Sequence, residues 1–164
     1  MEEKTNRMNE ELIRKFYSCF QQKDWQGMQA CYDDEITFSD LVFENLKGKR
    51  TKAMWHMLVS ASTDLVIQFQ GVKADANKGS GDWDAWYTFS RTGNKVHNII
   101  HAEFEFRDSK FIRHTDTFNL TRWAGMALGL PGKLLGWTPF IHSKVRKTAQ
   151  YSLEKFISTH PEYQ

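Results

Sequence analysis

The stretch between residues 65 and 118 limits the fold more than any other part of the chain, because strand-like segments follow one another there with only short breaks. Gly93-Asn94 and Asp108-Ser109 are residue pairs that favour tight hairpin turns. Strands joined through such turns are antiparallel neighbours, so the pattern predicts a four-stranded meander. Its strands are expected at about 65–72, 83–90, 95–106 and 110–118.

Helical periodicity precedes these strands. Apolar residues recur at helical spacing up to Phe20, and Thr5 or Asn6 would cap that first helix. A short second helix, a strand at 36–40 and a helix after Gly48 follow. This order predicts an α+β domain with its helices on one face of a bent sheet.

The last part of the chain reads as helical again. We expect a domain at 1–120 and a helical extension at 121–164 that packs on it, with a final helix beginning near Pro139. The segment 129–137 is apolar and broken by Gly and Pro. We expect it to lie across the mouth of a cavity, because three of its large side chains would need cover: Leu134, Leu135 and Trp137.

Composition excludes several classes of function. The 164 residues are 40% hydrophobic, enough for one domain with a sizeable core, and a net charge of +2 is too small to indicate nucleic-acid binding by electrostatics. The first residues lack the apolar stretch of a signal peptide, and no run approaches the roughly 18 apolar residues of a membrane span. With only two cysteines, Cys19 and Cys31, a reduced cytoplasmic protein is expected.

Three stretches of the sequence resemble a known superfamily. Asp24-Trp-Gln-Gly27 and the segment from Tyr32 to Asp40 are similar to the second helix and first strand of ketosteroid isomerase. Residues 102–120 are similar to the closing hairpin of limonene epoxide hydrolase and of polyketide cyclases of the SnoaL type. All belong to the nuclear transport factor 2-like superfamily, which has a cystatin-like fold.

This resemblance covers about residues 6–120 and implies a cone-shaped curved antiparallel sheet, packed on N-terminal helices around a deep pocket. It also implies self-association through the sheet, so a homodimer is expected. The fold carries many chemistries and some non-enzymes, so it does not by itself select a reaction.

Strand parity and the resemblance together assign an inward face to the sheet. Successive strand side chains point to opposite faces, so His114 and Asp116 share one face, which the resemblance turns toward the pocket. The side chains assigned to this interior are mostly apolar, as a pocket for a small apolar molecule requires. Those expected to contact that molecule are Phe16, Trp83, Tyr87, Asn98, Ala102, Phe104 and Phe118.

Asp40 stands where the resemblance places the aspartate that moves protons in the isomerases. A carboxylate at the mouth of an apolar pocket has a raised pKa and can act as a base near neutral pH. The alternative is an aspartate at a strand end that accepts hydrogen bonds from local backbone amides. Both interpretations stay open at this point.

The reactions of two relatives are not expected. Phe16 and Ala102 occupy the positions where the isomerases carry the two acids that hold the enolate oxygen, and each such donor is worth about 3 kcal/mol. Asp116 matches an acidic residue of the epoxide hydrolase. However, Trp83-Asp84-Ala85 stands where that enzyme carries Arg-x-Asp, so its water-activating set is incomplete.

His114 and Asp116 lie two apart on one strand face, with about 6.5–7 Å between their α-carbons. Side chains at this spacing can share a hydrogen bond or flank one ligand, and an imidazole beside a carboxylate is a competent general base. The alternative is a buried polar pair that holds the strand register. We favour a catalytic or ligand-contacting role, because buried polar groups are costly.

Metal and membrane sites are not expected. No group of His, Cys and acidic residues has ligand spacing, and His97 and His101 on one strand face lie about 13 Å apart, so neither a metal nor another cofactor is indicated.

Lys144, Arg146 and Lys147 form a basic patch beside the apolar stripe of the final helix. Docking on a membrane surface is one explanation. Packing of the stripe on the sheet or on a second subunit is the plainer one.

The sequence therefore predicts an enzyme that carries out acid–base chemistry, such as isomerisation, dehydration or hydrolysis, on a small, mostly apolar molecule. Asp40, His114 and Asp116 would handle protons. Tyr87 and Asn98 would orient the substrate. The alternative is a non-catalytic module of the same fold that binds a small ligand or dimerises, which the missing isomerase donors and the incomplete hydrolase set favour.

Overall fold

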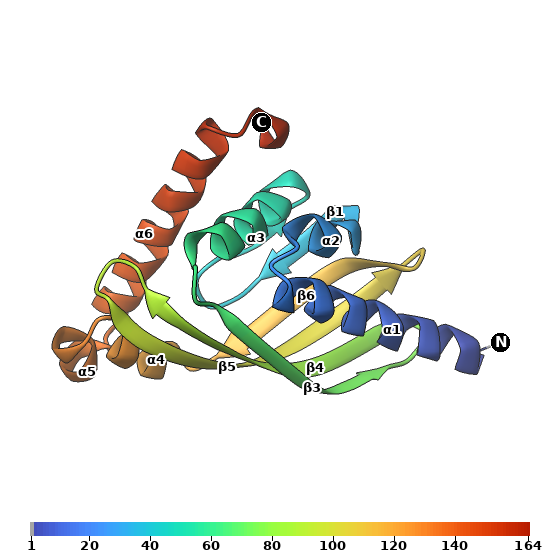
Figure 1. The fold of residues 1–164 in the computed structure, drawn as a ribbon, viewed down its shortest axis with the longest axis horizontal. Helices are drawn as coiled ribbons and strands as arrows, with labels where there is room; N and C mark the ends of the chain where they lie inside the picture. The colour runs from blue at the N-terminus through green and yellow to red at the C-terminus, as the bar shows by residue number, and fades with distance from the viewer. Residues whose placement is uncertain (1) are drawn as a thin grey trace.

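The computed structural model describes residues 2–164 and shows a curved six-stranded sheet with helices packed on one side (Figure 1). The strands lie side by side in the order β2-β1-β6-β5-β4-β3. Their bounds are β1 Tyr32–Ser39, β2 Leu46–Lys47, β3 Val66–Ala74, β4 Lys78–Phe89, β5 Asn94–Arg107 and β6 Lys110–Phe118. The predicted meander and the α+β class are confirmed.

One strand pair departs from the expected antiparallel arrangement. β1 runs parallel to β6, while every other neighbouring pair is antiparallel, so the sheet is mixed. The register of this pair sets Phe38 opposite His114. A chain segment that precedes the meander thereby becomes its neighbour, which local sequence patterns cannot indicate.

The first helix, α1 (Glu2–Gln21), packs against β3 and β4 and buries Ile13, Phe16, Tyr17 and Phe20. It begins ahead of the caps predicted at Thr5 and Asn6. Two glutamates in its first turn interact favourably with the positive end of the helix dipole and support the earlier start. The next helices are α2 (Trp25–Ala30) and α3 (Lys49–Ala61).

Glycine allows α1 to lie close to the sheet. β4 begins at Lys78, within a segment whose small residues predict a loop. A Cβ at Gly79 would lie 2.7 Å from Cδ1 of Ile13 and 2.8 Å from Cζ of Phe106. The absent side chain therefore lets β4 continue beneath the helix instead of breaking.

Three helices follow the sheet, and α6 packs against α3 (Figure 1). They are α4 (Leu120–Ala127), α5 (Leu130–Leu135) and α6 (Pro139–Ser158), with a short 3₁₀ helix, η1, at Pro161–Tyr163. Asn119 caps α4 by accepting a hydrogen bond from the backbone N–H of Arg122.

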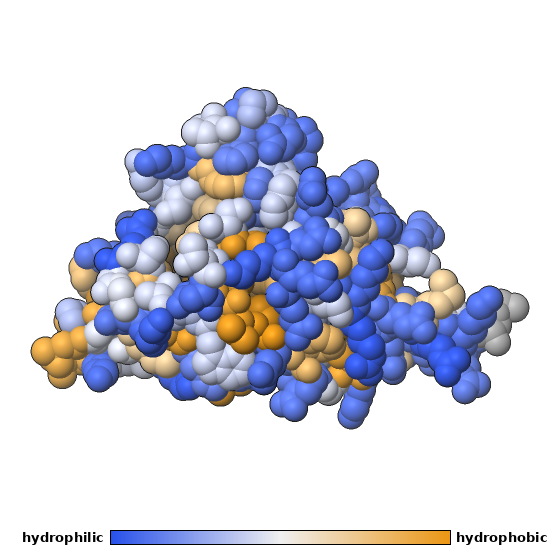
Figure 2. All heavy atoms as spheres, in the orientation of Figure 1, coloured by the Kyte–Doolittle hydropathy of each residue, from blue (hydrophilic) through white to orange (hydrophobic). Residues whose placement is uncertain are grey.

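Of the segment 129–137, expected across the mouth of a cavity, Pro131 lines the cavity described below, but the cover expected for its three large apolar side chains is missing. Leu134, Leu135 and Trp137 are exposed, Trp137 by 68%. Figure 2 shows hydrophobic side chains gathered at the tip of the molecule where α5 lies. α5 packs on α4 through Gly132, whose place beside the backbone of Ala124 leaves no room for a side chain. This packing turns the large apolar side chains outward.

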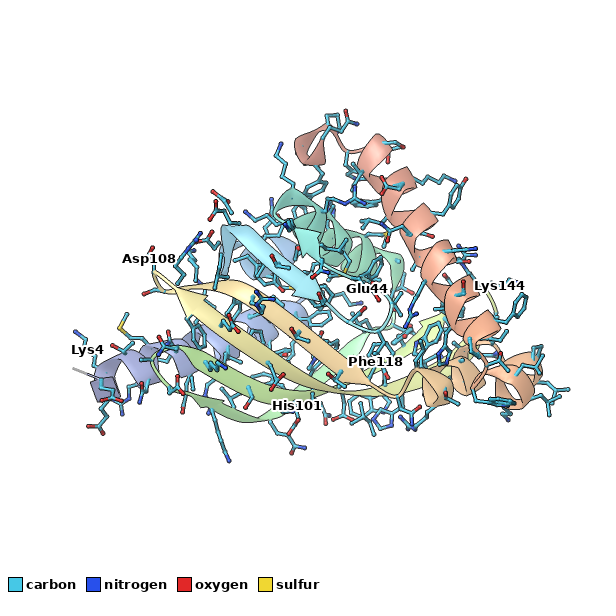
Figure 3. The ribbon with its side chains drawn as sticks, turned by 180° about the vertical axis from the view of Figure 1, so that it is seen from behind. Lys4, Glu44, His101, Asp108, Phe118 and Lys144 are labelled. Carbon is cyan, nitrogen blue, oxygen red and sulfur yellow. The ribbon has the colours of Figure 1, made fainter. Side chains whose placement is uncertain are left out.

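The outer face of the sheet is more polar than the face under the helices. His101 lies there on β5 (Figure 3), with its Nδ1 2.6 Å from a carboxylate oxygen of Asp82. Ile99 lies on the same face and is exposed. Self-association through this face stays a prediction. Within residues 2–164, none of the helices combines the length and the apolar character needed to cross a membrane.

Candidate functional site

A cavity of about 610 Å³ lies between the sheet, α3 and α6. Most of its wall is apolar, and two carboxylates reach it, Asp40 from the turn after β1 and Asp116 from β6. Phe118 at the end of β6 and Lys144 on α6 line it from opposite elements (Figure 3). Four side chains predicted to contact a ligand line this wall: Trp83, Tyr87, Asn98 and Phe118.

Asp116 is held at the wall by two donors that approach the same oxygen. Nε2 of His114 lies 3.0 Å from Oδ1, and the indole N–H of Trp83 donates to Oδ1 at 3.4 Å. The carboxylate is almost fully buried. Both of these bonds go to Oδ1, and neither of them engages Oδ2.

His114 belongs to a hydrogen-bonded chain that begins at Tyr32. The hydroxyl of Tyr32 lies 2.7 Å from Nδ1 of His114. Assigned from this network, Nε2 carries the proton that it donates to Asp116, and Nδ1 accepts from the phenol. Burial raises the pKa of Tyr32 well above its ordinary value, so the phenol keeps its proton. Tyr32 thus donates to His114, and His114 donates to Asp116; we call this hydrogen-bonded chain the relay.

The structure places His114 behind the cavity wall, not in it. The imidazole is 0% exposed and is packed among aromatic rings, with centroid separations of 4.4 Å to Phe104 and 5.1 Å to Phe38. Both ring nitrogens already have partners. His114 is therefore not among the side chains that line the cavity, which argues against the direct contact with a ligand expected of it.

Three more residues predicted to contact a ligand lie in the same packed region and not in the cavity wall. Phe16 reaches from α1 to within 5.6 Å of the His114 ring, centroid to centroid, and Phe104 covers that ring from β5. Ala102 is fully buried opposite Asp116 in the β5–β6 register. The side chains of α1 fill this end of the interior, so the cavity occupies only the end toward α6.

Asp40 follows β1 and lies in the turn toward β2. Its Oδ1 accepts hydrogen bonds from the backbone N–H groups of Val42 at 2.7 Å and Phe43 at 2.6 Å. Both interpretations of this residue therefore describe real features: it binds local amides, and it lines the cavity.

The surroundings of Asp40 favour its neutral form. Burial raises the pKa of Asp40 to about 7. The two hydrogen bonds from backbone N–H groups oppose this rise, and the negative charge of Asp116 adds to it. A carboxyl group with this pKa is present in both protonation states near pH 7, as a group that takes up and returns a proton must be.

Tyr87 and Asn98 supply polar groups to the cavity wall from β4 and β5. The indole N–H of Trp123 on α4 donates to the Tyr87 hydroxyl at 2.7 Å. Burial raises the pKa of Tyr87, so its hydroxyl stays protonated and can donate to a ligand.

Sequence reasoning missed two parts of the site. Tyr32 has the same strand parity as Phe38, a signal that could have placed it inside, although the β1–β6 register is irregular between them. The wall contributed by α6, including Val145 and Thr148, had no such signal because it depends on how that helix packs. Arg146 on α6 also donates to the backbone carbonyl of Leu41 at 2.8 Å, next to Asp40.

A second group of polar side chains lies away from the cavity, where no ligand set was expected. His56, His160 and Glu162 present ligand atoms within 4.8 Å of one another. They come from α3 and from the C-terminal end of the chain, so their spacing in the sequence gave no indication of their proximity.

Comparisons with known proteins agree on the fold. The family model for the SnoaL-like domain matches residues 13–114. A candidate polyketide cyclase from Xanthomonas campestris pv. campestris superimposes with a TM-score of 0.64 at 17% identity, covering 75% of this chain and 98% of that one. No curated protein matches the chain.

Two further solved structures carry other reaction names on this fold. An LEH-like epoxide hydrolase from M. tuberculosis has a TM-score of 0.61 at 15% identity and covers 80% of this chain and 98% of its own. A candidate ketosteroid isomerase from Kribbella flavida has a TM-score of 0.54 at 14% identity, covering 70% and 79%. At these identities the likeness extends to the fold alone.

Proposed function

The chain belongs to the family of SnoaL-like domains, and from this premise we propose that it is an enzyme that carries out acid–base chemistry on a small, mostly apolar molecule. The observation that carries the proposal is that Asp40 and Asp116 line one apolar cavity in contrasting settings. Burial brings the pKa of Asp40 to about 7, whereas Asp116 accepts hydrogen bonds from fixed donors. Paired acids in different environments are typical of sites that move protons.

In this proposal Asp40 is the proton-transferring group. Its ionised form would accept a proton from a bound substrate, and the neutral form would return it at another position or to a leaving group. Isomerisation, dehydration and hydrolysis all require such a transfer. Tyr87 and Asn98 would orient the substrate through their polar groups in the wall.

Asp116 would act as the second polar contact, and His114 and Tyr32 would position it. The relay holds the carboxylate through Oδ1 and leaves Oδ2 for a contact with the ligand. The isomerase reaction itself is not proposed, because the positions of its two oxyanion donors are the buried apolar residues Phe16 and Ala102.

One observation favours the non-catalytic alternative. The backbone N–H groups of Val42 and Phe43 donate hydrogen bonds to Asp40, and stabilising this turn is by itself a sufficient reason for an aspartate at this position. The cavity would then only retain a ligand.

Exchange in heavy water separates the two functions. Native mass spectrometry of the purified protein would first identify a bound small molecule, which is then incubated with catalytic amounts of protein in D₂O. The enzyme proposal expects deuterium in the ligand or conversion to a product, and loss of both in Asp40→Asn. Asp82→Asn, on the outer face, is the matched control and should behave as wild type. A ligand recovered unchanged and without deuterium would establish the binding module.

A further inference from the structure

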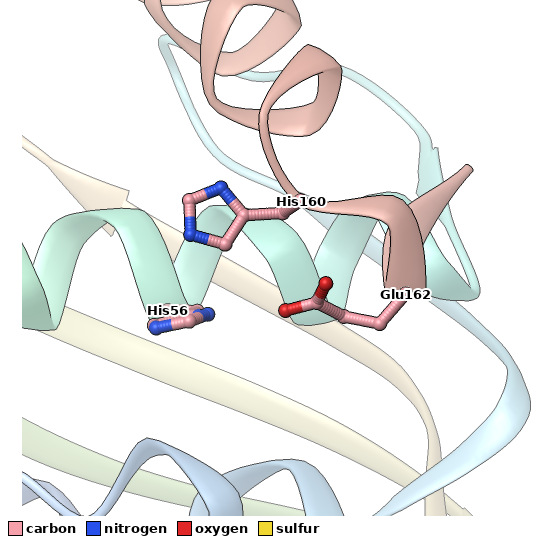
Figure 4. Close-up of side chains that lie close together, drawn as sticks. All are labelled: His56, His160 and Glu162. Atoms are coloured by element: carbon pink, nitrogen blue, oxygen red, sulfur yellow. The ribbon is translucent and has the colours of Figure 1, made fainter.

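Two imidazoles and a carboxylate lie close together where the C-terminal end of the chain meets α3, outside the cavity wall. His56 lies on α3, His160 follows α6, and Glu162 lies in η1 (Figure 4). Their nearest ligand atoms are all within 4.8 Å of one another. This group shares no residue with the cavity wall, so its chemistry is independent of the proposed function.

His160 is oriented with one ring nitrogen free. Its Nδ1 lies 2.7 Å from the backbone carbonyl oxygen of Phe156, which can only accept a hydrogen bond. Nδ1 therefore carries the proton, and Nε2 keeps its lone pair. The ring also stacks on Phe156 with centroids 3.8 Å apart. In Figure 4 the free nitrogen of His160 points toward His56.

His56 is fixed in a comparable way. Its Nδ1 lies 3.0 Å from the hydroxyl oxygen of Tyr163, and its ring stacks on Trp25 with centroids 3.6 Å apart. When Nδ1–H donates to Tyr163, Nε2 is left as the ligand atom. The amide of Gln29 donates to the same hydroxyl at 2.8 Å and holds it in place. Metal-binding histidines commonly donate their second N–H to such an oxygen.

We propose that His56, His160 and Glu162 bind one divalent transition-metal ion, with Zn²⁺ as the ordinary occupant. Two imidazoles and one carboxylate suit borderline metals such as Zn²⁺, Co²⁺ and Ni²⁺, whereas Mg²⁺ and Ca²⁺ prefer oxygen ligands alone. Water would complete a four-coordinate site.

Closing this site needs only a small movement. Ligand atoms around tetrahedral zinc lie about 3.3 Å apart, so the three side chains must approach by about 1 Å or more. Glu162 is exposed and can supply its part of that movement by rotation, and the remainder would come from small shifts of the two rings. The carboxylate is thus the mobile ligand of the set.

The metal would link α3 to the C-terminal end of α6, and both helices line the cavity. α3 contributes Met54 and Leu58 to the wall, and α6 contributes Val145 and Ala149. The site joins the last turns of the chain to α3, where Tyr163 is already buried. An ion there would hold α6 against α3 and so keep the cavity closed on that side.

Calorimetric titration of the tag-free, EDTA-treated chain with ZnCl₂ tests the site. We expect one Zn²⁺ per chain, at least tenfold weaker binding in Glu162→Gln and in His160→Gln, and a Tm about 5–10 °C higher at roughly a hundredfold excess over Kd. His101→Gln is the matched control, since that imidazole also faces a carboxylate but has no third ligand, and it should bind as wild type does.

Side-chain ¹⁵N NMR identifies the ligands directly. Of the six histidines, only two should shift strongly on adding Zn²⁺, and these should disappear from the spectra of His56→Gln and His160→Gln. Glu162→Gln alters an exposed side chain, so its metal-free Tm should match that of wild type and separate ligand loss from misfolding. Wild-type binding weaker than about 100 μM, or binding that survives both Glu162→Gln and His160→Gln, would overturn the proposal.

Discussion

Tyr32 and His114 are 82 positions apart in the chain, yet the phenol oxygen of one lies 2.7 Å from Nδ1 of the other. The parallel pairing of β1 with β6 brings them together. Because His114 is fully buried, Tyr32 is what satisfies its second ring nitrogen and thereby sets which nitrogen faces Asp116. The orientation of the cavity carboxylate thus depends on a residue in a different strand.

Tyr32→Phe should destabilise the protein. The substitution leaves a buried imidazole nitrogen without its partner, which costs about 1–3 kcal/mol in the free energy of unfolding. Urea denaturation followed by circular dichroism measures this loss. Tyr151→Phe, at a tyrosine that is 68% exposed, is the control and should change the free energy by less than about 0.5 kcal/mol. Equal effects of the two variants would contradict the relay.

The contribution of Asp40 to the stability of the protein should fall as pH rises from about 4 to about 7. Burial raises the folded-state pKa of Asp40 to about 7, while the unfolded chain has about 3.9. Between these values the folded state binds more protons at Asp40 than the unfolded state does, so stability decreases with pH and levels off above pH 7. The loss attributable to this group should be about 4 kcal/mol, since the two pKa values differ by roughly 3.

Urea denaturation at pH 5 and pH 8 isolates the contribution of Asp40. Asp40→Asn keeps an oxygen that can accept from Val42 and Phe43 but removes the titration. The variant should therefore lose less stability than wild type over this interval. Parallel pH profiles for the two proteins would show that the carboxyl group titrates normally.

Asp116→Asn should lower the pKa of Asp40. The negative charge of Asp116 disfavours ionisation of its neighbour, so its removal favours the ionised form. The asparagine oxygen can still accept from His114 and Trp83, which keeps the local packing. Carboxyl ¹³C chemical shifts followed through a pH titration would measure the change. An unchanged or increased pKa at Asp40 would mean that the two groups do not interact.

Gly79→Ala should be destabilising, whereas Gly81→Ala in the same strand should be nearly neutral. A Cβ at Gly79 would lie 2.7 Å from Ile13, forcing α1 away from β4 at a cost of about 1–3 kcal/mol. At Gly81 the nearest atom would be 3.6 Å away, an ordinary contact. Thermal unfolding of the two variants compares them directly. A similar Tm for both variants would show that the close approach of α1 is not what requires glycine at position 79.

Local patterns were sufficient for much of the fold. Strand alternation and hairpin turns identify β3 to β6 and put Trp83, Asn98 and Asp116 on one face, because the two-residue period of a strand depends on nothing beyond that strand. The resemblance added the position of Asp40 and the cone shape of the sheet, and the family match confirms that fold.

Tertiary structure alone decided what the inward-facing residues can reach. Parity cannot distinguish the part of the interior filled by α1, where His114, Phe16 and Ala102 are buried, from the part left open toward α6. The same limit applies to Tyr32 beside His114 and to His56 beside His160, since each contact joins elements that are distant in the chain. Periodicity reports the direction of a side chain, whereas a site also needs the element that faces it, and only packing supplies that.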